Sequence, residues 1–377
     1  MGQDKAGTDV TRIVVAMSGG VDSSVAAAIL QQEGHEVIGI TMQVHPANEP
    51  TEDTEKSGGF CGADAAADAV TDARRVAHRL GIPHYVADFR DIFIREVITD
   101  FCREYSLGRT PNPCIRCNRF VKFEALRRRA QELGTDMVAT GHYARIDKSN
   151  GRYLLKKGAD SSKDQAYVLY MMNQEQLGHT LFPLGELTKQ EVRRIAERLG
   201  LSVAARPESQ DICFIPDNDY ARFVREYTGI DAGPGPVLDR EGNVLGEHRG
   251  ITSYTVGQRK GLGISSRAPL YVVAIDREKN TVTVGGKEEV YATGLVASAL
   301  NWVSVERPEK PLTVRAKIRY LHQEAEAVVT PSGEDEVRVV FGEPQMAITP
   351  GQAIVFYDGD TVVGGGTIVR VVRESAW

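Results

Sequence analysis

The residues best suited to chemistry near the start of the chain form a loop rich in glycine and serine, SGGVDSS, at residues 18–24. An apolar run from Arg12 to Met17 precedes the loop, and an apolar helical pattern from Ser24 to Glu33 follows it. A turn between a strand and a helix leaves backbone N–H groups at the positive end of the helix dipole, where anions bind. Glycines let the backbone approach a phosphate closely, and serine hydroxyls add donors. The pattern predicts a phosphate-binding loop.

Asp22 is the unusual member of this loop, because its carboxylate would lie beside a negative phosphate. A carboxylate in that position is typical of a Mg²⁺ ligand, so Asp22 is a candidate metal ligand. The lysine of a Walker A motif is missing, which argues against γ-phosphate transfer of the usual kind. The alternative is that Ser18 only caps a helix and the glycines only turn the chain. Strand, turn, Asp, paired Ser and helix agree, and together they favour the phosphate site.

Cysteines are the second group of candidates. Cys114 and Cys117 form a C-x-x-C motif in NPCIRCN. A thiol becomes a useful nucleophile as the thiolate, and Arg116, Arg119 and Lys122 are near enough in sequence to favour that form. The residues alone leave three alternatives open, which are sulfur or redox chemistry, a structural metal site, and ordinary buried cysteines.

Three further positions bear on these alternatives. Cys213 lies in SQDICFIP, a turn-rich stretch of the kind in which reactive groups are often displayed. A tetrahedral metal site would need Cys213 and His142, or another residue, to complete it. Cys102 falls in an amphipathic pattern and is predicted to pack in a helix.

The elements that must position these residues alternate between strand and helix. This alternation predicts an α/β fold with a mostly parallel sheet covered by helices. The expected strands are Arg12 to Met17, Glu36 to Met42, His84 to Phe89 and Asp136 to Thr140, and the expected helices are Ser24 to Glu33 and Asp68 to Leu80. The polar, acidic segment Pro46 to Gly62 is expected to be a mobile loop.

The C-terminal part has a different period. Residues from Leu312 to Tyr320 alternate between apolar and polar, and Tyr357 to Asp360 is typical of a hairpin turn. Several such strands between Trp302 and Val372 predict a small β-barrel. We therefore expect a catalytic domain at residues 1–215, a middle domain at 216–288 and a C-terminal barrel at 289–377.

Composition excludes several classes of protein. The chain has 377 residues, 42% of them hydrophobic and 25% charged, which is typical of a globular protein. No apolar run approaches the ~20 residues that span a bilayer, and the five cysteines are too sparse for a secreted disulfide scaffold. We expect a cytoplasmic protein without a membrane partner.

The net charge of −6 argues against nucleic acid, but the acids are unevenly placed. From Ile115 to Ala130 there are six Lys or Arg against one Glu, and Arg315, Lys317 and Arg319 share one face of a predicted strand. Each cluster could be an ordinary solvated face. Their placement beside the cysteines and on a barrel favours local contacts with RNA.

The set SGGVDSS resembles the PP-loop of the ATP pyrophosphatase superfamily, whose members split ATP between its α- and β-phosphates. Along nearly its whole length the chain also resembles the tRNA-specific 2-thiouridylase family. The segments that carry this resemblance are AMSGGVDSS, DARRVAHRLGIPHYVADF, TPNPCIRCNRFVKF, ATGHYAR, SKDQAYVLY, FPLGELTKQEVRRIA, ESQDICFIP, GEHRGITSYTVGQRKGLGI, KIRY and TPGQAIVFY.

The resemblance implies ATP-dependent 2-thiolation of the wobble uridine of tRNA, with a sulfur-donor or sulfur-relay protein as a second partner. It implies a catalytic cysteine at Cys117 and a persulfide carrier at Cys213, and these two would form a disulfide as sulfur is transferred. The implied ATP contacts are Ala16, Met17, Ser18, Gly19, Gly20, Val21, Asp22, Ser23, Met42 and Gly141. The implied base or RNA contacts are Asn112, Pro113, Cys114, His142, Lys163, Asp164, Gln165, Arg319, Tyr320 and Gln352.

Three alternatives stay open. Some family members carry Asp where this chain has Cys114, so Cys114, Cys117 and Cys213 could instead hold an iron-sulfur cluster with one iron open to exogenous sulfur. The chain could also be another PP-loop enzyme that adenylates a carboxylate, or a non-catalytic RNA-binding protein with a structural zinc.

Overall fold

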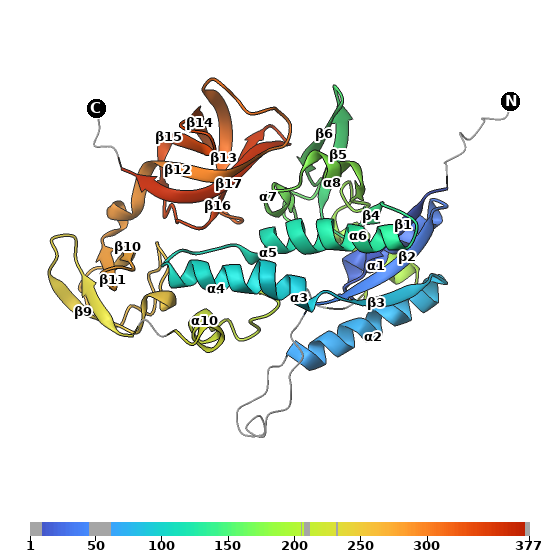
Figure 1. Ribbon diagram of the computed structural model, residues 1–377, viewed down its shortest axis with the longest axis horizontal. Coiled ribbons are helices and arrows are strands. Elements are labelled where there is room, and N and C mark those ends of the chain that lie inside the picture. Colours follow the sequence, from blue (N-terminus) through green and yellow to red (C-terminus); the bar gives the residue numbers. More distant parts are fainter. Residues whose placement is uncertain (1–9, 45–61, 205, 207–211, 231–232, 374–377) are drawn as a thin grey trace. The chain divides into compact units, whose positions relative to one another are not determined.

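The chain divides into two compact units. The computed structural model describes residues 10–44, 62–204, 206, 212–230 and 233–373 (Figure 1). Unit 1 holds Met1–Glu96 and Arg116–Pro216, and unit 2 holds Val97–Ile115 and Asp217–Trp377. Of the helices in the described ranges, none is long and apolar enough to cross a membrane. The predicted loop from Pro46 to Gly62 lies almost entirely outside the described residues.

A five-stranded parallel sheet forms the centre of unit 1, in the order β3-β2-β1-β4-β7. Its strands are β1 (Arg12–Ala16), β2 (Glu36–Gln43), β3 (His84–Asp88), β4 (Val138–Ala139) and β7 (Thr180–Leu181). The four residues of β1 after Arg12 are buried, as expected for a parallel strand covered on both faces. The predicted fold class is confirmed in this unit.

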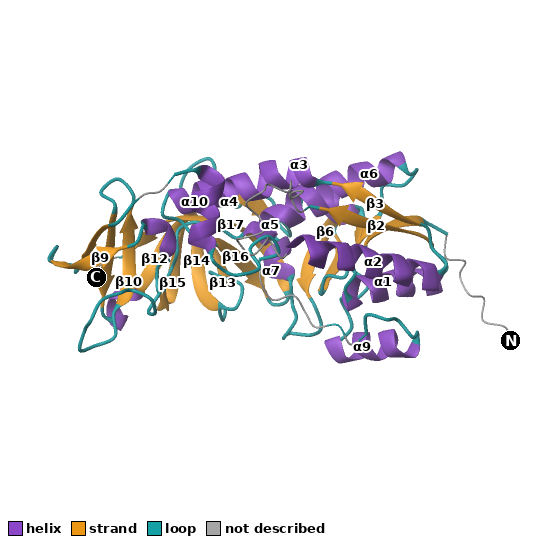
Figure 2. Ribbon diagram, turned by 90° about the horizontal axis from the view of Figure 1, so that it is seen from below, coloured by secondary structure: helices purple, strands orange, loops and turns teal. Residues whose placement is uncertain are grey.

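Helices cover both faces of this sheet. The helical segments of unit 1 and its boundaries are α1 (Val21–Gln32), α2 (Gly62–Leu80), α3 (Arg90–Phe93), η1 (Ile94–Ile98), α5 (Pro113–Arg116), η2 (Cys117–Ala125), α6 (Leu126–Glu132), α7 (Ala166–Leu169), α8 (Gln174–Gly178) and α9 (Lys189–Arg198). Figure 2 shows α1 and α9 on one side of the sheet and α6 on the other. Val25 and Ala26 of α1 share one apolar core with Val192 and Ala196 of α9. A hairpin of β5 (Ala144–Ser149) and β6 (Arg152–Lys157) follows β4.

The middle part of unit 2 is a four-stranded sheet in the order β10-β11-β8-β9. The strands are β8 (Gly235–Leu238), β9 (Val244–His248), β10 (Tyr271–Asp276) and β11 (Thr281–Gly285), with short 3-10 turns η3 (Ile251–Ser253) and η4 (Lys287–Val290). Among the residues that the structure describes, the α-helices α4 (Thr99–Ser106) and α10 (Tyr220–Thr228) lie wholly in this unit. Their aromatic side chains pack together, with Tyr105 stacked on Tyr220 and Phe101 edge-on to Phe223.

The C-terminal part of unit 2 is a closed six-stranded barrel in the order β12-β15-β14-β13-β16-β17, and β12 pairs with β17. Its strands are β12 (Tyr291–Trp302), β13 (Leu312–Lys317), β14 (Ala325–Pro331), β15 (Glu336–Met346), β16 (Ala353–Asp358) and β17 (Thr361–Val372). Where the barrel closes, β17 lies very near β12. A Cβ on Gly364 would be 2.5 Å from the carbonyl oxygen of Asn301. A glycine at this position permits the close approach.

The first strand of the barrel begins at Tyr291. The structure corrects two predicted strand boundaries. The strand expected from Asp136 is limited to Val138–Ala139, because the N–H of Met137 is taken by the Thr135 hydroxyl. The late strand ends at Lys317, so Arg319 lies in the turn that follows it. The domain boundaries at 215 and 288 stay predictions.

Candidate active site

The predicted phosphate loop connects β1 to α1 at the carboxyl end of the parallel sheet, where ligands bind in open α/β folds. Two bonds fix the end of β1. The N–H of Met17 donates to the carbonyl of Ile40, and the Thr41 hydroxyl donates to the carbonyl of Met17, each at 2.8 Å. Ala16 and Met17 are buried, and Met42 lies near the carboxyl end of the neighbouring strand β2.

The loop is folded on itself through serine hydroxyls. The N–H of Ser18 donates to Oγ of Ser23 at 3.1 Å, while the hydroxyls of Ser23 and Ser24 both donate to the carbonyl of Gly20, at 3.2 and 2.8 Å. Gly19 has φ +73°, and a Cβ there would lie 2.3 Å from the carbonyl oxygen of Ala69, so only glycine fits.

The N-terminus of α1 is where the structure separates the two interpretations of this loop. The N-cap residue is Gly20, and no side chain of the described residues caps the helix. Ser18 is therefore not the cap, and that part of the alternative is wrong. The first-turn N–H groups of α1 lack a side-chain acceptor, which is the geometry that an anion completes.

Asp22 meets two partners that the sequence did not indicate. Both of its carboxylate oxygens accept from Nζ of Lys189 at 2.8 Å, and Oδ1 also accepts from the hydroxyl of Tyr143 at 2.8 Å. Lys189 is 8% exposed. A Mg²⁺ ion at Asp22 would have to displace this ammonium, so the carboxylate does not fit a metal in this arrangement.

Lys189 is the first residue of α9, and the local sequence explains its position. Thr188 and Glu191 form a capping box, in which the Thr188 side chain accepts from the N–H of Glu191 and the Glu191 side chain accepts from the N–H of Thr188. The N–H of Lys189 itself donates to Asp160 at 2.9 Å. The T-x-x-E pattern of a capping box occurs in GELTKQEVRRIA. It does not indicate the ion pair, because Lys189 lies 167 residues from Asp22 in the sequence.

The segment after β4 packs against the same loop. A Cβ on Gly141 would lie 2.7 Å from backbone atoms of Asp22 and Ser23, so the loop and this segment touch directly. Gln165 holds the segment from the other side, because its side-chain oxygen accepts from the N–H of Tyr143 and its own N–H donates to the carbonyl of Tyr143. Three of the segments that carry the family resemblance thus converge on Asp22.

Two other predicted RNA contacts, Lys163 and Asp164, lie in the turn before α7. Oδ1 of Asp164 accepts from the N–H groups of Gly158 and Ala166, at 3.1 and 3.0 Å. Lys163 is partly exposed. Asp164 therefore shapes this turn, and an RNA contact at Lys163 or Asp164 stays a prediction.

His142 is buried. Its Nδ1 lies 2.6 Å from the hydroxyl of Thr140, and its ring contacts those of Phe123 and Phe182. Burial, with a smaller contribution from Lys122, holds the pKa of His142 well below its ordinary value, so the ring is neutral at physiological pH. The position is that of an ordinary core histidine, and a contact of His142 with RNA stays a prediction.

Cys117 and Cys213 both belong to unit 1. Cys117 opens η2 and is partly buried, whereas Cys213 is exposed. Phe214, directly after Cys213, is buried and packs edge-on against Phe93 at 5.6 Å. Phe93 ends α3, which also contacts η2. The segments that carry the two cysteines thus share α3 as a packing partner.

The surroundings of Cys117 contain the predicted cations, but they are engaged. Arg116 donates from Nε to the carbonyl of Glu96 at 2.6 Å, and both Arg116 and Arg119 lie over the ring of Phe120 at 4.9 Å. Cys114 is exposed, and the boundary between the two units falls between it and Cys117. Among the residues that the structure describes, no three Cys, His, Asp or Glu side chains gather as a metal site. The three-cysteine cluster stays a prediction.

In unit 2, two groups of predicted RNA contacts meet. Nε2 of Gln352 donates to the carbonyl of Thr110 at 2.8 Å, beside Asn112 and Pro113, and the N–H of Thr110 donates to the carbonyl of Pro350. The side chain of Asn112 accepts from the N–H of Cys114 at 3.2 Å.

The remaining predicted pair, Arg319 and Tyr320, lies in the turn after β13. Lys317 is 5.7 Å from the ring centre of Tyr320. Arg315 points outward as predicted, but it faces Glu324 and Glu326, each at 3.9 Å, which offset its charge.

Cys102 lies in α4 and is 1% exposed, as predicted for a packing residue. Burial raises the pKa of its thiol to about 12, so it stays protonated at physiological pH. It is not a candidate nucleophile.

A parallel sheet with a serine-rich anion loop at its carboxyl edge defines a nucleotide-binding domain of the HUP class. The family described as tRNA methyl transferase HUP domain matches residues 11–217, the tRNA methyl transferase PRC-barrel domain matches 221–286, and the aminomethyltransferase beta-barrel domain matches 292–368.

Curated relatives are similar over almost the whole chain. The tRNA-specific 2-thiouridylase MnmA of Acetivibrio thermocellus is 55% identical over 95% of this chain and 99% of its own length, and that of Heliobacterium modesticaldum is 56% identical over 95% of this chain and 92% of its own. The chain belongs to the tRNA-specific 2-thiouridylase family.

Proposed function

We propose that this chain catalyses ATP-dependent 2-thiolation of the wobble uridine of tRNA. The observation that carries the proposal is the convergence, in unit 1, of the anion loop, Tyr143 and Lys189 around Asp22, in a unit that also holds Cys117 and Cys213. The loop suits a polyphosphate, and the two cysteines suit sulfur transfer. We place the reaction in the cytoplasm, with tRNA as substrate and a persulfide-bearing protein as sulfur donor.

The first step activates a poor leaving group. The 2-oxygen of uridine attacks the α-phosphorus of ATP, pyrophosphate leaves, and the base carries AMP on that oxygen. The N–H groups at the start of α1 and the serine hydroxyls stabilise negative charge on the phosphates. Lys189, at the start of α9, neutralises the Asp22 carboxylate, so that this carboxylate does not repel the phosphates. Mg²⁺, when bound to ATP, would add further neutralising charge.

The second step uses sulfur held on the protein. The terminal sulfur of a persulfide on Cys213 attacks the activated carbon, and AMP leaves with the oxygen. The Cys117 thiolate then attacks Sγ of Cys213, which breaks the S–S bond to the transferred sulfur, leaves that sulfur on the base and forms a Cys117–Cys213 disulfide. A thiol reductant returns both cysteines to the reduced form. The exposed position of Cys213 supports its loading by a donor protein.

Two readouts on the same variants test the proposal. With ATP, tRNA and a persulfide donor, Cys213→Ser and Cys117→Ser should each lose 2-thiouridine, measured by mass spectrometry of nucleosides. Both variants should keep ATP–pyrophosphate exchange in the presence of tRNA, because adenylation precedes sulfur transfer. Undiminished thiolation by Cys213→Ser would overturn the assigned role of that residue. If the wild-type protein shows no ATP–pyrophosphate exchange under the same conditions, the adenylation step is overturned.

A further inference from the structure

An exposed basic loop in the middle part of unit 2 is not used by the reaction above. Residues 249–270, between β9 and β10, contain four cationic side chains, Arg249, Arg259, Lys260 and Arg267, and no Asp or Glu, although the whole chain carries a net charge of −6. All four side chains are exposed. The segment is therefore a local region of positive charge on an acidic protein.

The cations of this loop differ from the other arginines in their partners. Many exposed arginines elsewhere face carboxylates, as Arg128 faces Glu124 and Arg222 faces Asp219. Within the described ranges, no ion pair involves any of the four cations of residues 249–270. Their charge is thus available to an external anion.

The loop is built to hold a fixed shape. Leu262 is 7% exposed and packs into the apolar core with Ile251 and Val272. The glycines on either side of it, Gly261 and Gly263, have φ of +75° and +70°, which lets the chain enter and leave this anchor sharply.

Gln258 braces the start of the loop. Its Oε1 accepts from the N–H of Thr255 at 3.0 Å, and its Nε2 donates to the carbonyl of Lys260 at 3.0 Å. Its backbone also pairs with Val272, because the N–H of Val272 donates to the Gln258 carbonyl at 2.9 Å. A braced loop loses little conformational entropy when its cations bind a ligand.

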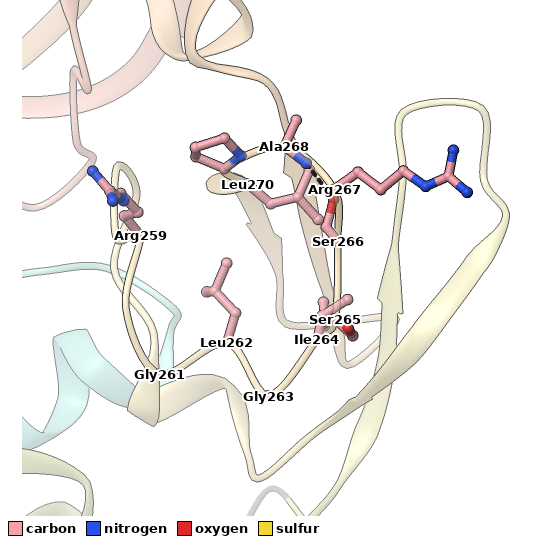
Figure 3. A pocket seen from close by; sticks show the side chains of 11 residues that line it. Arg259, Gly261, Leu262, Gly263, Ile264, Ser265, Ser266, Arg267, Ala268 and Leu270 are labelled. Carbon is pink, nitrogen blue, oxygen red and sulfur yellow. Dashed lines mark hydrogen bonds between the residues drawn. The ribbon is translucent and has the colours of Figure 1, made fainter.

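The loop borders an open cavity of about 710 Å³ lined by residues between Arg259 and Leu270. Figure 3 shows Arg259 and Arg267 on opposite sides of this hollow, with the guanidinium of Arg267 extended away from the loop. The lining is glycine, serine and short apolar side chains between two arginines. Separated guanidinium groups suit an extended chain of anions better than one compact anion.

We infer that this loop is a second contact surface for the phosphodiester backbone of the tRNA substrate, separate from the residues that handle the base. The inference rests on the proposed function for the identity of the RNA. Phosphate contacts position a nucleic acid without reading its sequence, so this surface orients the tRNA and does not select the nucleoside.

The test compares Arg259→Gln/Arg267→Gln with wild type in tRNA binding at several salt concentrations. Two lost phosphate contacts should lower the slope of log affinity against log salt by about 1.4 to 1.8, at about 0.7 to 0.9 each. If affinities are equal at 1 M salt, this corresponds to roughly 25- to 60-fold weaker binding at 0.1 M. Lys279→Gln is the matched control, because this exposed cation of the same domain already faces Asp276, and it should leave the slope unchanged.

Rates separate this inference from the proposed function. At saturating tRNA the double variant should thiolate as fast as wild type, with only its KM for tRNA raised. An unchanged slope and an unchanged KM would overturn the inference, as would wild-type tRNA binding combined with weakened binding of the sulfur-donor protein. If wild type itself forms no 2-thiouridine while the slopes differ as expected, the proposed reaction fails and the RNA surface stands.

Discussion

Replacing Lys189 by Met tests the electrostatic design of the anion loop, because Met keeps most of the side-chain length and removes the charge. In the structure Nζ lies 2.8 Å from both oxygens of Asp22. Without the ammonium, the local charge of the pair changes from zero to −1, directly beside the N-terminus of α1. The phosphates of ATP would then meet an uncompensated carboxylate, and we expect weaker ATP binding.

The size of the effect follows from the exposure of the pair. A carboxylate charge and a phosphate charge, taken as two unit charges 4 Å apart, repel by about 4 kcal/mol at an effective dielectric constant of about 20. The side chain of Lys189 is 10% exposed and that of Asp22 is 33% exposed, so solvent screens part of this energy. We expect a loss of about 2 to 3 kcal/mol in ATP binding, which is a roughly 30- to 150-fold rise in Kd at about 1.4 kcal/mol per tenfold.

Calorimetric titration with ATP measures this effect, and thermal unfolding establishes that each variant is folded. Lys156→Met serves as the control, because Lys156 is a cation of the same unit that faces Asp147 at 3.1 Å, away from the loop. Asp22→Asn/Lys189→Met should regain part of the lost affinity, since the pair is again neutral. A folded Lys189→Met protein that binds ATP as tightly as wild type would refute the reasoning, and so would a double variant weaker than the single one.

Two other predictions concern packing and pH. Gly141→Ala should weaken ATP binding, because its Cβ would lie 2.7 Å from backbone atoms of Asp22 and Ser23 and the loop would have to shift; equal ATP affinity in titration would contradict this contact. The Cys102 thiol has a pKa raised from 9.0 to about 12 by burial, so its contribution to stability is complete below pH 9 and is lost as pH rises toward 12. Wild type should therefore lose more free energy of unfolding than Cys102→Ala between pH 8 and pH 10.5, by up to about 1.4 kcal/mol per pH unit above 9. Denaturant unfolding measures this difference, and an equal loss of stability in the two proteins would exclude the raised thiol pKa.

The parts of the site that the sequence predicts are local ones. The first strand, the loop and the first helix are consecutive from Arg12 to Gln32. The apolar periods of the strand and helix, and the glycines between them, are therefore enough to predict these elements. The alternation in β13 likewise predicts the outward position of Arg315, because period-two patterns depend only on neighbouring residues.

The parts that escape prediction depend on contacts between distant segments. Nothing near Asp22 in the sequence indicates that Lys189 and Tyr143 occupy its oxygens, so the sequence alone predicts a metal ligand at this carboxylate. The burial of His142 between Phe123 and Phe182 also needs the folded chain, because a single histidine has the same sequence pattern in a core and in a site.

The discontinuous composition of unit 2 affects the order in which the chain can fold. Residues Val97–Ile115 belong to unit 2, yet they are synthesised before half of unit 1. Phe101 and Tyr105 on α4 obtain their packing partners Tyr220 and Phe223 only after the chain has been extended by more than a hundred residues. A nascent chain that has reached residue 216 therefore lacks two aromatic packing partners of α4, and a fragment that stops there lacks them permanently.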